Sequence, residues 1–416
     1  MSDELTTIEL ARKKLLDSIN ILKGKTKVTL QKSLMRISCN LIQSELNLPS
    51  TNNSAVDGYG ISSKTYFDNP KTKFKVIGVA KAGHPFDKEV GLGETIEIYT
   101  GAVMPRGIDT IIMHEKCNRV GDEVIIRDII KKNQNMRPVG ENLRKGEIVV
   151  EKGKLLNAAD IGQLAASGNS NIEVYKKLSV SVISTGDELI DPLSKNKLKG
   201  QIFDSNKPML TSLLSIHYLK VLDLGIVKDN RTQLAEKYAE ALIKSDVVIS
   251  SGGASDGIED HTQNALKDIG AKCLVWQLAM KPGKPMAIGM LGKKIIFCLP
   301  GNPVAAFVCT KLLINPILMK LAGGTDWDPL TFKLPSGFDH QKRNGRAEFL
   351  RAKIINKDQR SFIYLHGRKG AGVISSLTGA DGIVEIPLEA ETVSKGDFLK
   401  FYPVIVWCIT PEQFFC

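Results

Sequence analysis

The sequence has few aromatic residues, few histidines and no apolar run that approaches the roughly 18 residues of a membrane-spanning helix. Aromatic residues make up 6% of the chain and are not interleaved with its scattered Lys and Arg residues, so the net charge of +11 does not favour a nucleic-acid-binding surface. The six histidines are dispersed and lack the spacing of a zinc site. We therefore expect no membrane insertion, no nucleic-acid binding and no zinc.

Cysteine occurs seven times, an odd number, and without metal-type spacing. The chain begins Met-Ser-Asp-Glu-Leu, an acidic start that lacks the features of an export signal. We therefore expect a reducing, cytoplasmic setting. With 416 residues, the chain is long enough for several domains of about 100–200 residues each.

One stretch organises the rest of the chain: a short apolar strand, Asp246–Ser250, that runs into a turn rich in glycine, serine and acid. Such a turn offers backbone N–H groups and a helix N-terminus to an anion, and acids beside it commonly hold Mg²⁺ or orient a proton acceptor. Taken alone, the stretch fits an ordinary βα turn with solvated acids equally well. The turn contains Ser251, Gly252, Gly253, Ser255, Asp256, Gly257, Glu259 and Asp260.

Three further predicted strands also end in polar turns. Helical patterns fall between the strands, and this alternation predicts a doubly wound parallel sheet. In such sheets ligands bind outside the carboxyl ends of the strands, so the turns are expected to form one rim. The strands and their turns are Lys177–Ile183 with Ser184-Thr-Gly-Asp-Glu-Leu189, Tyr218–Val227 with Lys228-Asp-Asn230, and Lys294–Leu299 with Pro300-Gly-Asn-Pro303.

The helices between these strands have recognisable starts. Asp204-Ser-Asn206, Thr232 and Asn302 are the expected caps, and Pro303 is the expected first residue of its helix. The turn Met280–Met286 then brings two lysines into a proline-stiffened segment. Beside an acidic rim such a segment suits an oxyanion, although a solvated lysine pair is the simpler alternative.

The flanking regions are predicted to be rich in β structure. Short strands separated by turns run from Lys73 to Ile126, after a long polar loop that carries Asp57. The remainder from Leu330 to Cys416 is also strand-rich and predicts a small β-barrel or sandwich. An amphipathic helix over Thr7–Lys23 is expected to pack on a domain.

Nine short motifs run in order through nearly the whole chain. They are Ser54-Ala-Val-Asp-Gly-Tyr59, Thr100-Gly-Ala-Val-Met-Pro105, Arg137-Pro-Val-Gly-Glu-Asn142, Ser184-Thr-Gly-Asp-Glu-Leu189, Asp204-Ser-Asn206, Ser251-Gly-Gly-Ala-Ser-Asp-Gly257 with Asp260, Lys281-Pro-Gly-Lys-Pro285, Leu299-Pro-Gly-Asn-Pro303 and Arg346-Ala-Glu-Phe-Leu-Arg351. Together they resemble the molybdopterin molybdenumtransferase family, which includes the E domain of gephyrin. No single motif is decisive, but nine in the family's order are highly specific.

The resemblance implies a four-domain homodimer. Its fold class is α/β plus β, with a doubly wound α/β molybdopterin-binding domain, a β-rich insertion, an elongated connector and a C-terminal β-barrel. The first helix is expected to return and pack on the α/β domain. The implied divisions are 1–26 for this helix, 27–46 with 142–176 for the connector, 47–141 for the β-rich domain, 177–325 for the α/β domain and 326–416 for the barrel.

The resemblance also implies a reaction. The family hydrolyses adenylylated molybdopterin, releases AMP and transfers molybdate to the dithiolene. Adenylylated molybdopterin and molybdate are then the substrates and Mg²⁺ the cofactor, with molybdopterin adenylyltransferase and molybdenum enzymes as implied partners. Polyanionic ligands of this kind suit glycine N–H groups, a divalent cation and lysines.

The motifs carry residues with implied roles. Asp260 and Glu188 are assigned to Mg²⁺, and both act in catalysis together with Asp57 and Asp229. The implied molybdate ligands are Lys281, Lys284, Pro285 and Arg351. The implied substrate-binding residues are Thr100, Thr185, Gly186, Asp187, Ser205, Asn206, Gly252, Gly253, Ser255, Gly257, Pro300, Gly301 and Asn302.

Two positions depart from the family's pattern. Val56 stands where the family commonly has methionine, which is a mild change. Ala371 stands where many members place a serine in the oxyanion pocket, so a hydroxyl donor is missing unless Ser375 or Ser376 replaces it.

Two other functions remain open. A molybdopterin adenylyltransferase would resemble only the α/β region, and the β-rich flanks with Asp57, Thr100 and Arg351 argue against it. If the protein were a non-catalytic scaffold, we would expect long interaction linkers or an extra domain, and this sequence indicates neither. A scaffold role would also leave the acidic rim unexplained.

Overall fold

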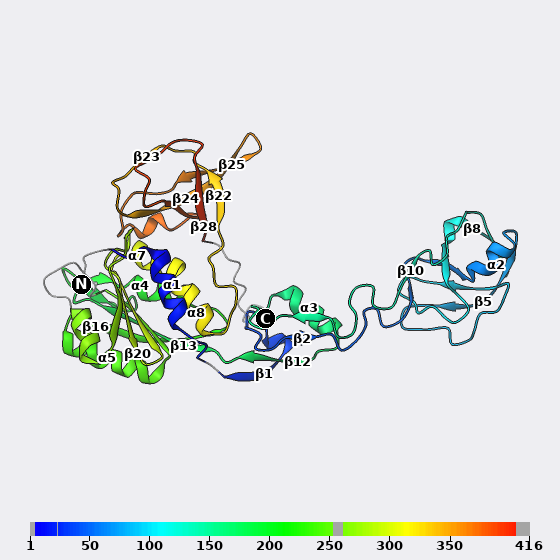
Figure 1. The fold of residues 1–416 in the computed structure, drawn as a ribbon, viewed down its shortest axis with the longest axis horizontal. Helices are drawn as coiled ribbons and strands as arrows, with labels where there is room; N and C mark the ends of the chain where they lie inside the picture. Colours follow the sequence, from blue (N-terminus) through cyan, green and yellow to red (C-terminus); the bar gives the residue numbers. More distant parts are fainter. Residues whose placement is uncertain (1–4, 23, 253–260, 405–416) are drawn as a thin grey trace.

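The computed structural model describes residues 5–22, 24–252 and 261–404. The described chain is elongated (Figure 1). An α/β unit and a C-terminal β unit lie together at one end, a β-rich unit lies at the other, and an extended connector joins the two ends (Figure 1). The loops that carry Asp57 and Thr100 therefore lie far from the α/β unit of their own chain.

A six-stranded sheet forms the centre of the α/β unit. The four predicted strands are all present, each within two residues of its predicted start and end. Helices cover both faces, as a doubly wound fold requires. In spatial order the strands are β16 (Leu219–Val227), β13 (Leu178–Thr185), β17 (Val247–Ser251), β21 (Lys294–Leu299), β20 (Ala287–Leu291) and β18 (Lys272–Trp276).

The predicted parallel arrangement holds for the four predicted strands, but the sheet also contains β20 and β18, which were not predicted, and β20 is antiparallel. β20 pairs antiparallel with both β21 and β18, so it runs against the other five strands. The cause is the connection to β21: Leu291 pairs with Lys294 across a two-residue turn that includes Gly292 at a φ of 58°. A turn this short joins antiparallel strands only, because a parallel crossover needs a dozen or more residues.

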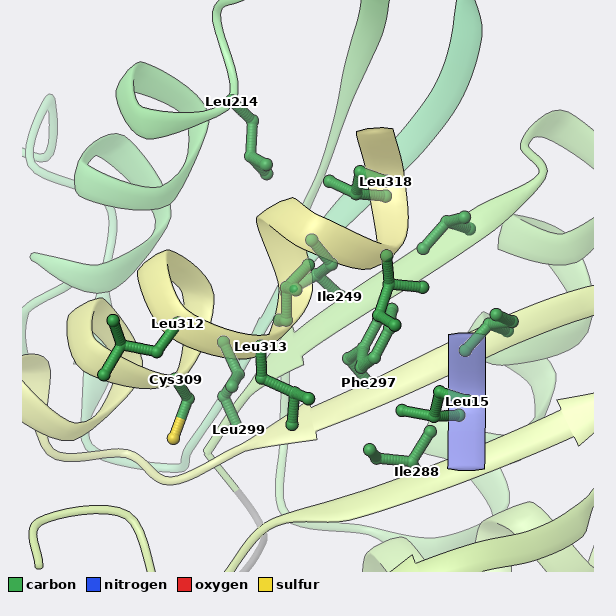
Figure 2. Close-up of a cluster of buried hydrophobic side chains, with 14 of the residues drawn as sticks. Leu15, Leu214, Ile249, Ile288, Phe297, Leu299, Cys309, Leu312, Leu313 and Leu318 are labelled. Atoms are coloured by element: carbon green, nitrogen blue, oxygen red, sulfur yellow. The ribbon is translucent and has the colours of Figure 1, made fainter. Parts of the chain in front are cut away.

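The larger core lies on one face of this sheet. Leu15 and Leu318, from the first and last helices of this face, pack over Ile249 and Phe297 of the strands (Figure 2). This contact confirms that the N-terminal helix returns to the α/β unit. The face is covered by α1 (Ile8–Ser18), α4 (Asn206–Leu213), α7 (Pro303–Cys309), the π-helical turn η3 (Thr310–Ile314) and α8 (Asn315–Leu321), and the other face by α5 (Arg231–Lys244) and α6 (His261–Asp268).

Helix starts and ends match the sequence only in part. α7 begins as predicted, with Asn302 as cap and Pro303 first. α1 ends at Ser18, before the predicted Lys23, because the next residue has extended backbone. The cap of α5 is not Thr232, which lies inside the helix; the residue before the helix, Asn230, accepts from the backbone of the first turn.

The run Pro303–Leu321 corrects one expectation. It is a helix long and apolar enough to cross a membrane by length and composition, although we expected no apolar run of that length. In the structure 78% of this window is buried, between the sheet and α1. Its apolar character is therefore accounted for by its place in the core of the α/β unit.

The β-rich unit and the connector are made of short strands. The polar loop that precedes Tyr59 contains one short strand, β3, which the sequence does not predict; β3 (Asn53–Ser54) pairs with β10 (Met136–Arg137). The unit's sheet has the order β7 (Thr110–Met113), β4 (Gly58–Ile61), β6 (Glu94–Ile98), β5 (Lys73–Ala80), β9 (Glu123–Ile126) and β8 (Cys117–Val120), beside α2 (Ser63–Asp68). The connector pairs β1 (Lys25–Thr29) with β12 (Asn171–Tyr175) and β2 (Ile42–Gln43) with β11 (Ile148–Val150), next to α3 (Ala158–Ala166).

The C-terminal unit is a curled sheet that also binds the α/β unit. A bridge between Ser336 and Ile363 brings the sheet back on itself, which is compatible with the predicted barrel. β19 (Met280–Lys281) of the α/β unit pairs in parallel with β24 and so ties the two units together. The strands are β22 (Phe332–Pro335), β23 (His340–Gln341), β24 (Ala347–Lys357), β25 (Arg360–Leu365), β26 (Gly382–Ile386), β27 (Thr392–Val393) and β28 (Phe398–Pro403).

Candidate functional site

The carboxyl ends of β13, β16, β17 and β21, where the predicted polar turns begin, lie along one edge of the α/β sheet. These four strands are parallel, so their carboxyl ends meet there. The chain passes from β13 to its neighbour β16 and then to β17 on the other side of β13. The connections from successive strands therefore leave β13 toward opposite sides of the sheet. A crevice forms at such a switch point, and it is the usual ligand site of open α/β sheets.

Thr185 and Asp229 link the turns after β13 and β16. Thr185 Oγ1 donates to Asp229 Oδ1 at 2.8 Å, and the Asp229 N–H donates to Asp187 Oδ1 at 3.3 Å. Thr185 is buried, whereas Asp187, Glu188 and Asp229 are exposed. The structure therefore places three predicted acids on one rim, with carboxylates that solvent and ligands can reach.

Asn206 holds the rim together. Its Nδ2 donates to Ser251 Oγ at the end of β17 and to Gly301 O after β21, both at 2.7 Å. The side chain is buried, and its Oδ1 has no hydrogen-bond partner among the described residues. Ser205, the residue before α4, makes no side-chain cap; Asp204 supplies it by accepting from the Asn206 N–H at 3.0 Å. The geometry thus shows a positioning role for Asn206, and its direct contact with substrate stays a prediction.

Gly252 allows the exits of β13 and β17 to approach each other closely. Its φ is 101°, and a Cβ at this position would lie 2.0 Å from Thr185 O. We expect Gly252→Ala to lower the melting temperature markedly, since backbone strain of order 1–3 kcal/mol adds to this clash. The control is Gly225→Ala, at a φ of 82° in the same unit but with no atom within 4 Å of the added Cβ. Equal melting temperatures for the two variants would show that close approach is not the constraint.

Of the other predicted rim residues, the structure describes some and not others. Gly186 is buried and its N–H donates to Val227 O at 3.1 Å, joining the turns after β13 and β16. Gly253, Ser255, Gly257 and Asp260 lie outside the described residues, so their roles stay predictions.

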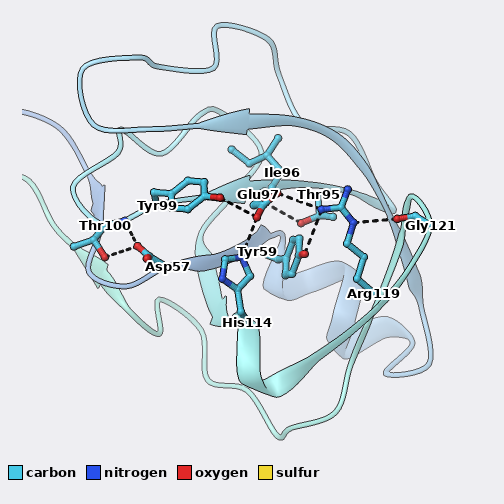
Figure 3. A network of polar contacts seen from close by, with 10 residues as sticks. All are labelled: Asp57, Tyr59, Thr95, Ile96, Glu97, Tyr99, Thr100, His114, Arg119 and Gly121. Carbon is cyan, nitrogen blue, oxygen red and sulfur yellow. Dashed lines mark hydrogen bonds and ion pairs between the residues drawn. The ribbon is translucent and has the colours of Figure 1, made fainter.

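Asp57 and Thr100 meet in the β-rich unit, on the loops before β4 and after β6 (Figure 3). Asp57 Oδ1 accepts from the backbone N–H and from Oγ1 of Thr100, both at 2.7 Å. The backbone hydrogen bond and then the hydroxyl hydrogen bond lower the pKa of Asp57 below its ordinary value. The loop therefore presents an exposed, ionised carboxylate.

A polar network around Glu97 supports this loop (Figure 3). Glu97 accepts from the Tyr99 hydroxyl at 3.1 Å and from Arg119 Nη1 at 3.2 Å, and its Oε1 lies 3.4 Å from His114 Nε2. The His114 ring packs edge-on against Tyr59 and Tyr99. These contacts hold together the ends of β6 and β7, the two strands that flank β4 and therefore Asp57.

A cavity of about 860 Å³ opens between the α/β unit and the C-terminal unit. It contains all four predicted molybdate ligands, together with Pro300 and Asn302 from the rim turn after β21. Within the described part of the chain, its lining carries seven Lys and Arg side chains and one carboxylate, which favours an anionic ligand. The cations are Lys281, Lys284, Lys342, Arg343, Arg346, Arg351 and Lys369, and the carboxylate is Glu348.

Arg351 is a buried cation in the wall of this cavity. Its Nε donates to Ser376 Oγ and its Nη2 to Arg368 O, both at 2.9 Å. In the part of the chain that the structure describes, no carboxylate pairs with it, and burial lowers the pKa of its guanidinium. A buried charge without a counter-ion is costly, so an oxyanion ligand would stabilise this arrangement.

Lys281 has a partner that the sequence does not predict. Its Nζ donates to Glu348 Oε1 at 2.9 Å, and His340 Nε2 lies 2.9 Å from Glu348 Oε2. Glu348 stands in a motif quoted above, three residues before Arg351, but it received no role; His340 belongs to no motif. The other cations missed by the sequence are Lys342, Arg343, Arg346 and Lys369.

The described residues contain no group of three or more His, Cys, Asp and Glu side chains arranged to hold a metal ion. Glu188 is within the described part of the chain and its proposed co-ligand Asp260 is outside it. The Mg²⁺ assignment therefore stays a prediction.

Three family models cover most of the chain in order. They are the MoeA N-terminal region, domains I and II, over residues 6–168, the probable molybdopterin binding domain over 181–320, and the MoeA C-terminal region, domain IV, over 333–404. The molybdopterin molybdenumtransferase of Haemophilus influenzae is 33% identical over 402 residues, 96% of this chain and 98% of that protein. The chain belongs to the molybdopterin molybdenumtransferase family.

Other relatives of the molybdopterin molybdenumtransferase family agree with this membership. The enzyme of that name from Staphylococcus aureus strain COL is 32% identical, over 86% of each chain. A solved molybdopterin biosynthesis MoeA protein from Pyrococcus horikoshii matches 97% of this chain and all of that one, with a TM-score of 0.80 and 28% identity. The family resemblance drawn from nine motifs is thereby confirmed, and so is a MoeA-like multidomain fold with mixed sheets.

Proposed function

We propose that this protein is a molybdenum insertase of molybdenum cofactor biosynthesis, a transferase that hydrolyses adenylylated molybdopterin, releases AMP and transfers molybdate to the dithiolene. One observation carries the proposal: a cationic cavity joins Arg351 of the C-terminal unit to Lys281–Pro285 and to Asn302 at the sheet rim. Family membership supports the same reaction, because relatives along nearly the whole chain are named molybdopterin molybdenumtransferase.

The two parts of the site suit different parts of the substrates. Arg351 and the Lys281–Pro285 turn present cations and hydrogen-bond donors to a small tetrahedral oxyanion. The turn after β17, most of which lies outside the described residues, is predicted from its glycines and serines to offer backbone N–H groups and hydroxyls that suit a phosphate. Asn302 lines the cavity and begins α7 at the rim, so it lies where the two parts meet.

Mg²⁺ is the proposed cofactor, because the rim acids supply the oxygen donors that this ion prefers. Glu188, with Asp260, would hold it, beside Asp187 and Asp229. When bound, Mg²⁺ supplies charge neutralisation of the phosphoanhydride. Asp229, which accepts a hydrogen bond from Thr185 at 2.8 Å, would orient the attacking water.

The remaining features of the proposal are a homodimer, a cytoplasmic setting, and exchange with molybdopterin adenylyltransferase and molybdenum enzymes. The direct test incubates the protein with adenylylated molybdopterin, Mg²⁺ and molybdate and measures AMP. ATP-dependent adenylylation of molybdopterin without AMP release from the adenylylated form would instead indicate an adenylyltransferase.

Ala371→Ser is expected to lower the half-saturating molybdate concentration about tenfold, because it adds a hydroxyl donor worth roughly 1.4 kcal/mol to the cavity wall. Ser376 does not already fill this role: its hydroxyl accepts from Arg351 at 2.9 Å and donates to Val373 O at 2.6 Å. Ser375 is absent from the lining, so Ser375→Ala is the control and should change nothing. An unaltered molybdate response in Ala371→Ser would mean that another group already supplies the hydrogen bond.

A further inference from the structure

Among the residues that the structure describes, Glu348 is the one acidic side chain in the lining of a cavity otherwise rich in cations. It is buried on β24, and both of its oxygens have partners: Lys281 Nζ donates to Oε1 and His340 Nε2 lies at Oε2, each at 2.9 Å. An anionic side chain beside an oxyanion weakens binding by repulsion. A carboxylate at this position therefore needs a compensating role.

The partners of Glu348 come from different parts of the fold. Lys281 lies directly across the β19–β24 pair from Glu348 and belongs to the α/β unit, whereas His340 belongs to β23 of the C-terminal unit. The Lys281 side chain is 61% exposed, but those of Glu348 and His340 are 10% and 6% exposed. Lysine has a long, flexible side chain, and here its ammonium group is held by the buried pair of Glu348 and His340.

The charge state of Glu348 fits such a role. Burial alone would raise the pKa of this carboxyl, but the hydrogen bonds from Lys281 and His340 outweigh burial and bring the pKa below its ordinary value. Glu348 is therefore ionised at neutral pH, where its carboxylate attracts the Lys281 ammonium.

We propose that Glu348, anchored by His340, is a positioning residue that holds the Lys281 ammonium against the cavity where molybdate binds. The proposal rests on the proposed function for the identity of the oxyanion. The competing explanation is a purely structural tie between the α/β unit and the C-terminal unit. The two differ in what happens to Lys281 and to molybdate when the carboxylate is removed.

The first measurement follows Lys281 itself. Reductive methylation of the intact protein, read by mass spectrometry, reports how readily each lysine amine reacts. We expect Glu348→Gln to speed methylation of Lys281 about fivefold, because the ammonium loses its ion-pair partner. We also expect molybdate to protect Lys281 in the wild type and not in Glu348→Gln. This measurement does not require catalysis.

The second measurement uses molybdate-dependent AMP release. Glu348→Gln should raise the half-saturating molybdate concentration about tenfold and leave kcat within about twofold, the pattern of a lost binding contact. Glu348→Asp keeps the charge and should restore part of the molybdate affinity; it also serves as the second variant should Glu348→Gln fail to fold.

The matched control is Glu385→Gln. Glu385 is a buried carboxylate on the adjacent strand β26; it accepts from the Tyr402 hydroxyl at 2.6 Å, lies 3.1 Å from Lys400 Nζ and does not line the cavity. This variant should lose stability without changing Lys281 methylation or the molybdate requirement.

If Glu348→Gln behaves like Glu385→Gln in both assays, the carboxylate is only a structural tie and the proposal is overturned. Failure of the proposed function looks different: the wild type would release no AMP, and molybdate would not protect Lys281, whereas the effect of Glu348 on Lys281 methylation would persist.

Discussion

Arg351→Ala is expected to raise the half-saturating molybdate concentration at least about a hundredfold, which corresponds to roughly 2.8 kcal/mol of binding free energy. The guanidinium is buried in the cavity wall and has hydrogen bonds to Ser376 Oγ and Arg368 O, but no carboxylate among the described residues. A buried cation of this kind interacts strongly with an anion that enters the cavity, and truncation of such a partner typically costs 2–5 kcal/mol.

Arg36→Ala is the matched control for Arg351→Ala. Arg36 is also a buried arginine whose pKa is lowered by burial, and its Nη2 donates to Tyr175 O at 2.8 Å. It does not line the cavity. We expect it to affect thermal stability and leave the molybdate response unchanged. Similar molybdate requirements in the Arg351 and Arg36 variants would place the oxyanion elsewhere.

A mixture of Asp57→Ala and Asp229→Ala subunits is expected to regain activity that neither variant has alone. Asp57 lies in the β-rich unit, at the opposite end of the chain from the rim that carries Asp229 (Figure 1). One chain therefore does not bring the two acids together. In a two-fold dimer each β-rich unit can cover the rim of the other subunit, and the exchange is reciprocal.

The expected yield follows from counting sites. With random mixing, half of the dimers contain one subunit of each kind. In each of these, one site combines both lesions and the other site is intact, so the mixture should reach about a quarter of wild-type activity. Asp260→Ala, on the same predicted rim, should behave like Asp229→Ala.

The control mixture combines Asp57→Ala with Thr100→Ala. Both residues lie in the β-rich unit, 2.7 Å apart at their side-chain oxygens, so every site in a mixed dimer receives one damaged loop. This mixture should stay inactive. If the Asp57 and Asp229 variants, verified as mixed dimers by differential tags, stay as inactive as their parents, Asp57 acts within its own chain or only in folding.

The rim of the α/β unit could be predicted from the sequence because local patterns determine it. β17 begins with three apolar residues, Val247 to Ile249, and β13 alternates apolar residues with serines. The segments that follow both strands carry glycine and acids, and this combination predicts parallel strands with a ligand site at their carboxyl ends. The strand β20 was not predicted, and its direction depends on the short turn at Gly292 and not on an apolar period.

The surroundings of the cavity could not be predicted from local patterns. Lys281 and Arg351 were assigned through the family resemblance, but the partner of Lys281 depends on the pairing of β19 with β24, between segments far apart in the sequence. His340 gave no signal, since a lone histidine in a strand-rich region is usually structural. Asn206 was assigned to substrate from its motif, whereas its hydrogen bonds to Ser251 and Gly301 show that it holds the rim together.

The most direct test of the insertase account is a single-turnover experiment that measures AMP release and molybdenum transfer together. The protein is mixed with a substoichiometric amount of adenylylated molybdopterin and Mg²⁺, with and without molybdate, and both AMP and pterin-bound molybdenum are quantified. We expect one AMP released for each molybdenum transferred, and little of either in the Arg351→Ala variant at the same molybdate concentration. AMP release without molybdenum on the pterin, or no AMP release at all from folded wild-type protein, would contradict it.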